Sequence, residues 1–237
     1  MKESKSGFDR RDLLKGAAVA GLGMVTGAIG AQNSTKYDKG KHDLIREENA
    51  KPGTRDWMLT NTRQLPGKIN KNLPNGRCPW IEGYCSANSV RAGEKLQIMV
   101  STNPASAFKF EIFRTGYYNG DGGRLMRTFE SVEGKTQPDP PVGENYVREC
   151  NWEPSVEFEI PEDWLSGVYL GKLTAENNGI QSYVIFIVRD DRRCDFLFQC
   201  SDLTWSAYNR WPADYSIYTP HEKGFSTTGV PSGTVSF

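Results

Sequence analysis

The polar and aromatic segment at 201–210, which reads SDLTWSAYNR, holds the side chains of this sequence best suited to ligand chemistry. It directly follows CDFLFQC (194–200), a run apolar enough to be a strand buried on both faces. Loops that leave the carboxyl ends of parallel strands line the ligand crevice of an open sheet. The segment therefore predicts a substrate pocket built from a hydroxyl, an indole, a phenol and an amide. The candidates are Thr204, Trp205, Tyr208 and Asn209.

A structural interpretation of the same segment stays open. Aromatic side chains three residues apart, such as Trp205 and Tyr208, lie on one face of a helix and often only bury area. They would then pack at an interface between domains, and Ser201 or Asp202 would cap a short helix.

The glycine-rich stretch YYNGDGGR (117–124) also brings together groups that bind ions. Its oxygens would suit calcium, and Arg114 and Arg124 would suit an anion. Calcium gathers about six to eight oxygen ligands, whereas this stretch offers one carboxylate and one side-chain amide. A hairpin whose turn needs positive φ explains the same residues, and a hairpin is our prediction.

Nucleophilic and metal chemistry have few candidate residues in this sequence. The chain has two histidines, His42 in a polar segment and His221 in a loop-like stretch. It contains neither a GxSxG nucleophile elbow nor an HxxxH pair, so the sequence predicts no nucleophilic centre and no metal site. A pair of catalytic carboxylates stays open, because such pairs meet in space rather than along the chain.

Five cysteines, an odd number, leave the disulfide pattern undecided. An oxidising destination permits disulfides, and Cys78 and Cys85 could close a small loop, with Cys150 unassigned. Cys194 and Cys200 would lie about 20 Å apart on one face of a strand, which is too far to bridge. Both are predicted to be small core residues.

The elements that position these residues are predicted to be mainly strands. Apolar residues alternate with polar ones over three stretches, and an almost wholly apolar stretch follows: 96–101, 108–113, 155–160 and 182–188. Turn residues separate the stretches at 91–94, 103–104 and 119–123. Without a convincing helical period, the pattern predicts a mainly β fold, an antiparallel β-sandwich over residues 57–188.

The charged run RDDRR (189–193) precedes a segment of different character and is predicted to be a linker between domains. The apolar run at 194–200 resembles the first strand of a parallel sheet, and such a strand needs neighbours on both hydrogen-bonding edges. The short remainder of the chain is not expected to supply them. Either the strand joins the sandwich, or 194–237 is the truncated start of an α/β domain, which is our prediction.

Residues 1–31 are predicted to be an export signal. A charged start is followed by a Gly- and Ala-rich apolar stretch and a small-residue finish, with cleavage expected after Ala31. The adjacent Arg10 and Arg11 indicate the twin-arginine class. The apolar stretch is shorter than the roughly 20 residues of a membrane anchor, so we expect no stable membrane span and a periplasmic or extracellular location. Residues 32–56 are predicted to be an extended or disordered polar lead-in.

Five stretches, in this order, resemble the large (β) subunit family of N,N-dimethylformamidase, in particular its exported bacterial relatives. They are GTRDWMLTNTR (53–63), IEGYCSANSVRAGEKL (81–96), FEIFRTGYYNGDGGRLM (110–126), SGVYLGKL (166–173) and VRDDRRCDFLFQCSDLTWSAYNRW (188–211). The resemblance covers roughly residues 53–237, and it is specific because FRTGYYNGDGGR and SDLTWSAYNRW occur together.

The resemblance implies an immunoglobulin-like or lectin-like β-sandwich followed by a larger α/β domain similar to glutamine amidotransferases. It implies hydrolysis of the C–N bond of a small amide, with a mononuclear non-haem iron that tyrosine and carboxylate side chains hold in the α/β domain. No iron ligand matches a position of this sequence. The chain is therefore expected to be a fragment without cofactor, inactive alone. A small subunit or a homo-oligomer is implied as partner.

A non-catalytic β-sandwich that binds carbohydrate or a protein partner is the alternative. Tryptophans can present flat surfaces to sugars, and the candidates are Trp57, Trp80, Trp152 and Trp164. Basic and acidic residues are equal in number, 29 of each. Nucleic acid is therefore not expected as a partner, because its binding requires a basic surface. The twin-arginine export machinery is the other partner predicted.

Overall fold

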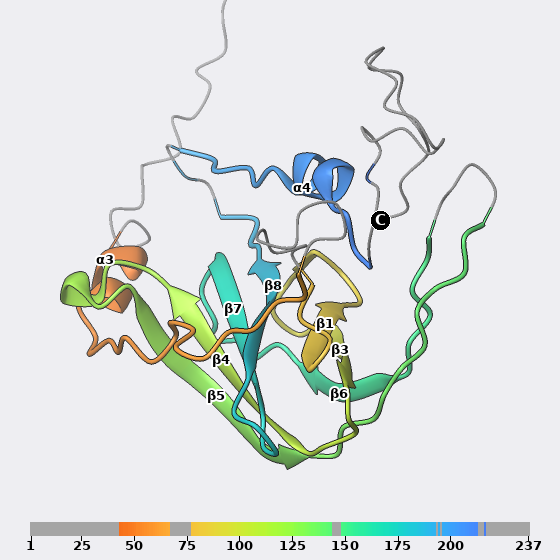
Figure 1. The fold of residues 1–237 in the computed structure, drawn as a ribbon. Helices are drawn as coiled ribbons and strands as arrows, with labels where there is room; N and C mark the ends of the chain where they lie inside the picture. Colours follow the sequence, from red (N-terminus) through yellow and green to blue (C-terminus); the bar gives the residue numbers. More distant parts are fainter. Residues whose placement is uncertain are drawn as a thin grey trace, which may run out of the picture. The chain divides into compact units, whose positions relative to one another are not determined.

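The computed structural model describes residues 43–66, 77–143, 148–192, 194, 196–212 and 216 (Figure 1). Their strands form a five-stranded sheet of order β2-β8-β7-β4-β5 and a three-stranded sheet of order β1-β3-β6. The strands are β1 (Ile81–Cys85), β2 (Ser89–Val90), β3 (Lys95–Thr102), β4 (Phe108–Thr115), β5 (Gly123–Val132), β6 (Pro154–Glu159), β7 (Gly167–Ala175) and β8 (Gln181–Val188). The helices are α3 (Leu44–Asn49), the short 3₁₀ helix η2 (Tyr118–Gly120) and α4 (Asp202–Tyr208).

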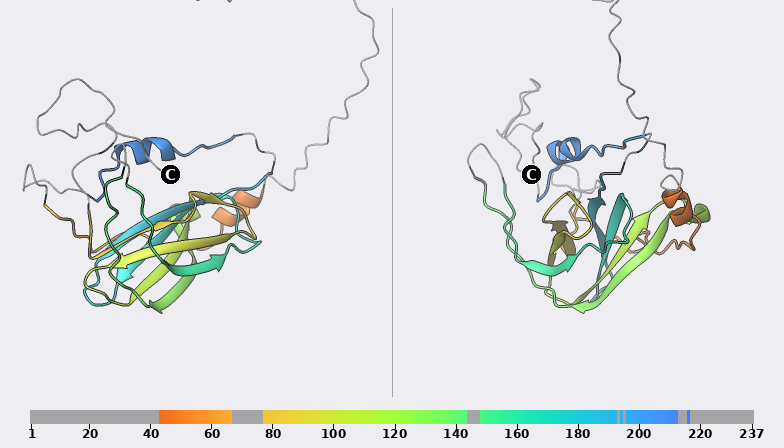
Figure 2. Two further views of the ribbon diagram at one scale, coloured as in Figure 1. Left: turned by 90° about the vertical axis from the view of Figure 1, so that its right-hand side faces the viewer. Right: turned by 180° about the vertical axis from the view of Figure 1, so that it is seen from behind.

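The two sheets pack against each other as a β-sandwich, which confirms the predicted fold class (Figure 2). Alternate side chains of each strand point inward and fill one core. Phe158 of the small sheet meets Phe186 of the large sheet edge-on, with ring centroids 6.4 Å apart. Tyr169 stacks on Phe186 at 5.4 Å and extends this aromatic layer within the core. The strand pairs are antiparallel except for the short β2, which runs parallel to β8.

The glycine-rich stretch forms the predicted hairpin between β4 and β5. Its turn holds Asn119, Gly120 and Gly122 at positive φ of 55°, 96° and 85°. Glycine takes such angles without the steric penalty of a Cβ, and asparagine tolerates them better than most residues. Trp57 closes the turn from outside, because its indole Nε1–H donates to the carbonyl oxygen of Asp121 at 2.9 Å.

The segment 43–61, here called the N-terminal strap, crosses the outer face of the five-stranded sheet from α3 towards β8 (Figure 1, orange). Lys172 of β7 is buried there, and its Nζ donates to the carbonyl oxygens of Asp56 and Met58 at 2.7 and 3.2 Å. On β8, the Oε1 of Gln181 accepts from the backbone N–H of Thr60 at 2.8 Å. The prediction of an extended or disordered lead-in is therefore wrong for residues 43–56. They contain a helix and are tied to the sheet by long-range hydrogen bonds.

The apolar run after the sandwich differs from its prediction. Residue 194 and residues 196–200 form no strand, and they do not join either sheet. The side chains of Phe196, Leu197 and Phe198 are 91, 89 and 82% exposed. The buried strand that we expected is therefore not formed among the described residues, because nothing within them covers these side chains.

The cysteines also differ from expectation. The five cysteines are free, and Cys194 is exposed rather than in the core. The loop-closing bond considered between Cys78 and Cys85 is not formed, because both are free thiols.

Several predictions fall outside the described residues. They concern Arg10, Arg11, Ala31, His42 and His221. Among the residues that the structure does describe, no helix is both long and apolar enough to cross a membrane.

Candidate functional site

The four residues predicted to line a pocket lie on α4 or directly after it. Thr204, Trp205 and Tyr208 are exposed, Trp205 by 53% and Tyr208 by 65%. No residue of α4 is buried. Ser201 is the N-cap residue but makes no side-chain capping hydrogen bond, so the predicted cap is not formed. A helix this short is only marginally stable by itself, so its position depends on the segments that flank it.

Asn209 turns the chain after α4. Its side-chain Oδ1 accepts from the backbone N–H of Trp211 at 3.0 Å, two residues on. This is the local hydrogen bond of an Asx turn. The structure thus uses the amide oxygen of Asn209 to direct Trp211 towards the sandwich, whereas Thr204, Trp205 and Tyr208 face outward.

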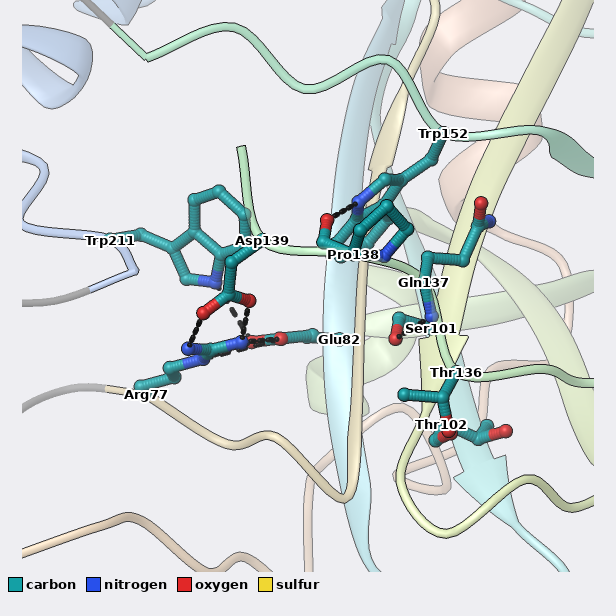
Figure 3. Close-up of polar contacts among 10 residues, drawn as sticks. All are labelled: Arg77, Glu82, Ser101, Thr102, Thr136, Gln137, Pro138, Asp139, Trp152 and Trp211. Atoms are coloured by element: carbon teal, nitrogen blue, oxygen red, sulfur yellow. Dashed lines mark hydrogen bonds and ion pairs between the residues drawn. The ribbon is translucent and has the colours of Figure 1, made fainter. Parts of the chain in front are cut away.

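Arg77 is the hub of a charged cluster at the start of β1 (Figure 3). Its Nη2 lies 2.8 Å from Oε1 of Glu82 and 2.6 Å from Oδ1 of Asp139, and its Nη1 lies 2.8 Å from Oδ2 of Asp139. The guanidinium fork therefore holds Asp139 through two parallel hydrogen bonds, the arrangement that makes Arg–carboxylate pairs strong. Arg77 and Glu82 are largely buried, with side chains 17 and 12% exposed, and Asp139 is half-exposed.

Trp211, which follows α4 in the chain, also belongs to this cluster (Figure 3). Its indole Nε1–H donates to Oε2 of Glu82 at 2.8 Å. The Cζ of Arg77 lies 5.4 Å from the Trp211 ring centroid, within cation–π range. Trp152 meets Trp211 edge-to-face with centroids 5.7 Å apart. We name the five residues Arg77, Glu82, Asp139, Trp152 and Trp211 the Arg77 cluster.

Asp139 and Trp152 reach this cluster from the segments 133–143 and 148–153, and buried Gln137 fixes the first of these segments to the sheet (Figure 3). Its Nε2 donates to the carbonyl oxygens of Val100 and Glu153 at 3.0 and 2.9 Å, and its Oε1 accepts from the N–H of Glu153 at 2.9 Å. Pro154 has no N–H for the ladder between β3 and β6. Next to Pro154, the Gln137 amide instead links Val100 of β3 to Glu153, the residue before β6.

The electrostatics of the cluster favour a fixed ion pair. The hydrogen bonds that Arg77 donates, to Asp139 first and to Glu82 second, raise the pKa of Arg77 against the opposing effect of burial. Its hydrogen bonds with Arg77 hold the pKa of Asp139 below the ordinary value. Both groups therefore stay charged at neutral pH. The nearby thiol of Cys150 has its pKa raised to about 12 by burial, so it is protonated and a poor nucleophile. The cluster is suited to holding chain segments together rather than to nucleophilic catalysis.

A second charged cluster surrounds Glu48 of α3, whose side chain is 3% exposed. Its Oε1 accepts from the hydroxyl of Tyr118 at 2.9 Å and from Nε of Arg124 at 2.7 Å, and its Oε2 lies 2.7 Å from Nζ of Lys51. The buried Arg114 donates to the Tyr118 hydroxyl at 2.9 Å. Burial alone would raise the pKa of Glu48, but the hydrogen bonds from Lys51, Arg124 and Tyr118 together lower it. We name these five residues the Glu48 cluster.

The residues of the Glu48 cluster do not fit the iron that the resemblance implies. Tyr118 and Glu48 are a tyrosine and a carboxylate in contact, the types of ligand expected. Three basic side chains already surround them, however, so the site repels a further cation. Among the described residues, no group of three or more His, Cys, Asp or Glu side chains is placed to hold a metal ion. Arg124 does bind an anion as its sequence suggested, but that anion is the chain's own Glu48.

Two of the four tryptophans proposed as sugar-binding surfaces are core residues. Trp152 and Trp164 are 7 and 6% exposed. Trp164 stacks on Tyr169 with centroids 4.9 Å apart and nearly parallel rings. Trp57 and Trp80 are partly buried, and Trp57 packs on the β4–β5 turn. The described aromatic residues of the sandwich thus mostly fill its core.

Comparison with known proteins agrees with the sequence resemblance. The family model described as "N,N-dimethylformamidase beta subunit-like, C-terminal" matches residues 109–237. The match contains β4 from Lys109 onward, β5 to β8 and α4, and therefore includes part of the sandwich and the segment that the Arg77 cluster holds. A search of curated proteins finds no match. The chain is a member of the N,N-dimethylformamidase beta subunit-like family.

The sequence analysis missed both charged clusters. Arg77 is separated from Asp139 and Trp211 by long stretches of chain, and Glu48 from Arg124 by 76 residues. No spacing rule connects such residues. One residue of the Arg77 cluster could have been suspected from the sequence, namely the tryptophan at the end of SDLTWSAYNRW. A large aromatic side chain just after a polar turn usually packs against another part of the protein.

Proposed function

We propose that this chain is the sandwich part of an exported amide hydrolase, which cleaves the C–N bond of a small amide when its catalytic part is present. The family match over residues 109–237 carries this proposal. It includes helix α4, on which Thr204, Trp205 and Tyr208 are exposed. Asn209 is the fourth residue of the proposed pocket, and its Asx turn sets the direction of the chain after α4.

The apolar run at 196–198 supports this assignment physically. In an extended chain successive side chains point to opposite faces, so covering Phe196, Leu197 and Phe198 requires apolar layers on both sides. An interior strand of a parallel sheet has that environment. We propose that 194–237 begins such an α/β domain, and that the iron implied by the family is bound there. As described here, the chain alone is expected to be inactive.

The test is hydrolysis of dimethylformamide and related small amides with Fe²⁺ or Fe³⁺ supplied, measured as release of the amine. The 237-residue chain is compared with the product of the gene read to its own stop codon. We expect turnover only from the longer product. Turnover by the 237-residue chain would contradict the fragment assignment. A longer, folded, iron-loaded product that hydrolyses no amide would contradict the proposed activity.

Export is a separate part of the proposal. We propose that the twin-arginine machinery exports the folded protein and that a signal peptidase removes residues 1–31. Arg10→Lys together with Arg11→Lys is expected to retain the protein in the cytoplasm with its signal attached, as judged by cell fractionation and the mass of the product. Normal export of this double variant would contradict the assignment. The family description as a beta subunit supports a further protein partner.

A further inference from the structure

We propose that Arg77 is a positioning residue, which clamps the segment after α4 to the sandwich and so fixes where the predicted pocket residues lie. This inference rests on the proposed function only for its effect on amide binding. Its structural part, that Arg77 holds Trp211 in place, stands on the contacts of the described residues alone.

The need for a clamp follows from α4 itself. None of its residues is buried, and it spans less than two helical turns. The preceding run at 196–198 belongs to no strand of either sheet and is highly exposed. Trp211, by contrast, is partly buried and contacts Glu82 of β1, Trp152 in the segment before β6, and Arg77. The attachment of α4 is therefore concentrated at its carboxyl-terminal side.

The chemistry of Arg77 suits it to this role. Its Nη1 and Nη2 bind Asp139, while Nη2 and Nε also reach Glu82. Oε2 of Glu82 accepts from Arg77 Nε at 3.3 Å and from the Trp211 indole at 2.8 Å, so the same carboxylate joins both residues. A lysine offers a point charge without the fork and is not expected to replace it. Without Arg77, the carboxylates of Glu82 and Asp139 would repel each other, and Glu82 would turn towards water.

The structural test uses the 237-residue chain and trypsin. The bond after Arg210 is adjacent to Trp211, and cleavage there requires that Trp211 leave its cluster. Arg77→Met is expected to raise the rate of cleavage after Arg210 roughly tenfold or more, because the rate follows the population of the open form. Trp211→Phe, which keeps a smaller aromatic ring but loses the N–H donor, is expected to give a smaller increase in the same cleavage.

Matched controls separate a clamp from general destabilisation. Arg127 also lies over aromatic rings, at 4.5 Å from the Phe129 centroid, but it has no contact with Trp211. Arg127→Met and Trp205→Phe are expected to leave cleavage after Arg210 within about twofold of the wild-type rate. Equal cleavage rates in Arg77→Met and Arg127→Met would overturn the proposal. If Arg77→Met does not fold, Trp211→Phe against Trp205→Phe decides, and equal rates in that pair overturn it.

A spectroscopic readout tests the position of Trp211 directly. Its indole N–H donates to Glu82 in a partly buried place, so its hydrogen should exchange more slowly than that of the exposed Trp205. The Trp211 signal is assigned by its loss in Trp211→Phe. We expect Arg77→Met to remove this protection while the backbone amides of β3 and β4 stay protected. Retained protection of the Trp211 indole would overturn the proposal.

An activity readout links the clamp to the proposed function. In the longer, active product, Arg77→Met is expected to raise KM for the amide several-fold with a smaller change in kcat, because displaced pocket residues weaken binding of substrate and transition state alike. Arg127→Met is the control. Unchanged KM with increased cleavage after Arg210 would overturn the link to substrate binding. Absence of amide turnover in every form would instead reject the proposed function and leave the clamp standing on its trypsin and exchange results.

Discussion

Two clusters attach segments outside the strands to the same sandwich, and their charges are arranged in opposite ways. The Glu48 cluster is centred on a carboxylate that basic side chains surround. The Arg77 cluster is centred on a guanidinium between two carboxylates, with an indole beside them. The first anchors α3 and the second anchors the chain after α4.

The difference between them lies in burial and in the number of further anchors. Glu48 is almost wholly buried, and the strap that follows it is held again at Lys172 and Gln181. The Arg77 cluster is partly open to solvent, and α4 has no buried residue. Because its central carboxylate is buried and further hydrogen bonds follow along the strap, we expect the strap to unfold only together with the sandwich. Because the Arg77 cluster is partly exposed and α4 has no buried residue, we expect the α4 segment to detach by local opening.

Removing the carboxylate of Glu48 is expected to have the largest effect on stability. Glu48→Ala leaves Arg124 and Lys51 without their shared partner, and loss of one member of a buried ion pair destabilises by about 3–5 kcal/mol. The free energy of unfolding is measured by urea titration. Glu47→Ala, at the exposed neighbour on α3, is the control and is expected to change it by less than about 0.5 kcal/mol. Similar losses in both variants would mean that the strap is not anchored through Glu48.

Removing the amine of Lys172 is expected to have an intermediate effect. Lys172→Met keeps the apolar stem but leaves the carbonyls of Asp56 and Met58 without their donor. Such a loss destabilises by about 1–3 kcal/mol. Lys95→Met, which removes an exposed lysine paired with Glu157, should change stability by less than about 1 kcal/mol. A Lys172→Met variant as stable as Lys95→Met would show that the strap does not depend on this contact.

Acid is expected to weaken the strap through Glu48. Because its folded-state pKa lies below the ordinary value of 4.5, Glu48 stabilises the fold above about that pH. This contribution is lost as the pH falls from 4.5 through the lowered pKa. The free energy of unfolding, measured with urea at several pH values between about 6 and 3, should therefore depend less on pH for Glu48→Gln than for the wild-type chain. Parallel pH profiles would contradict the assignment.

Thiol labelling leaves the sequence unchanged, and it compares the exposed segment before α4 with a strand of the sandwich. Cys194 is exposed in the segment before α4, whereas Cys85 in β1 has its pKa raised to about 12 by burial. At neutral pH a maleimide should modify Cys194 at least about tenfold faster than Cys85, as read by mass spectrometry of peptides. Comparable rates would indicate that the end of β1 opens as readily as the exposed segment.

The fold was largely predictable from local patterns. Alternation of apolar and polar residues gave the stretches that become β3, β4 and β6, and the apolar stretch at 182–188 becomes β8. The pattern did not indicate β1, β2, β5 or β7. β5 is an edge strand whose register with β4 shifts twice, which disturbs simple alternation. β7 carries Gly171, which fits closely beside Phe110, and Lys172 on the face that the strap covers.

The attachments were less predictable, for a physical reason. Glu48 lies in a short polar helix whose sequence resembles a solvated segment, and only Tyr118 and Arg124 from the β4–β5 hairpin make it a buried hub. The run at 196–198 has the composition of a buried strand, but burial needs covering layers, and composition does not supply them. Local sequence indicates what a segment can form, whereas its partners decide what it forms.

Hydrogen exchange of backbone amides along the chain tests the central comparison most directly. The account predicts that amides of α3 held at Glu48, and of the strap up to Asn61, exchange with the slow rates of the sandwich strands. Amides of 196–208 should exchange orders of magnitude faster, through local opening. Fast exchange throughout the strap, or protection of α4 equal to that of β3 and β4, would contradict the account.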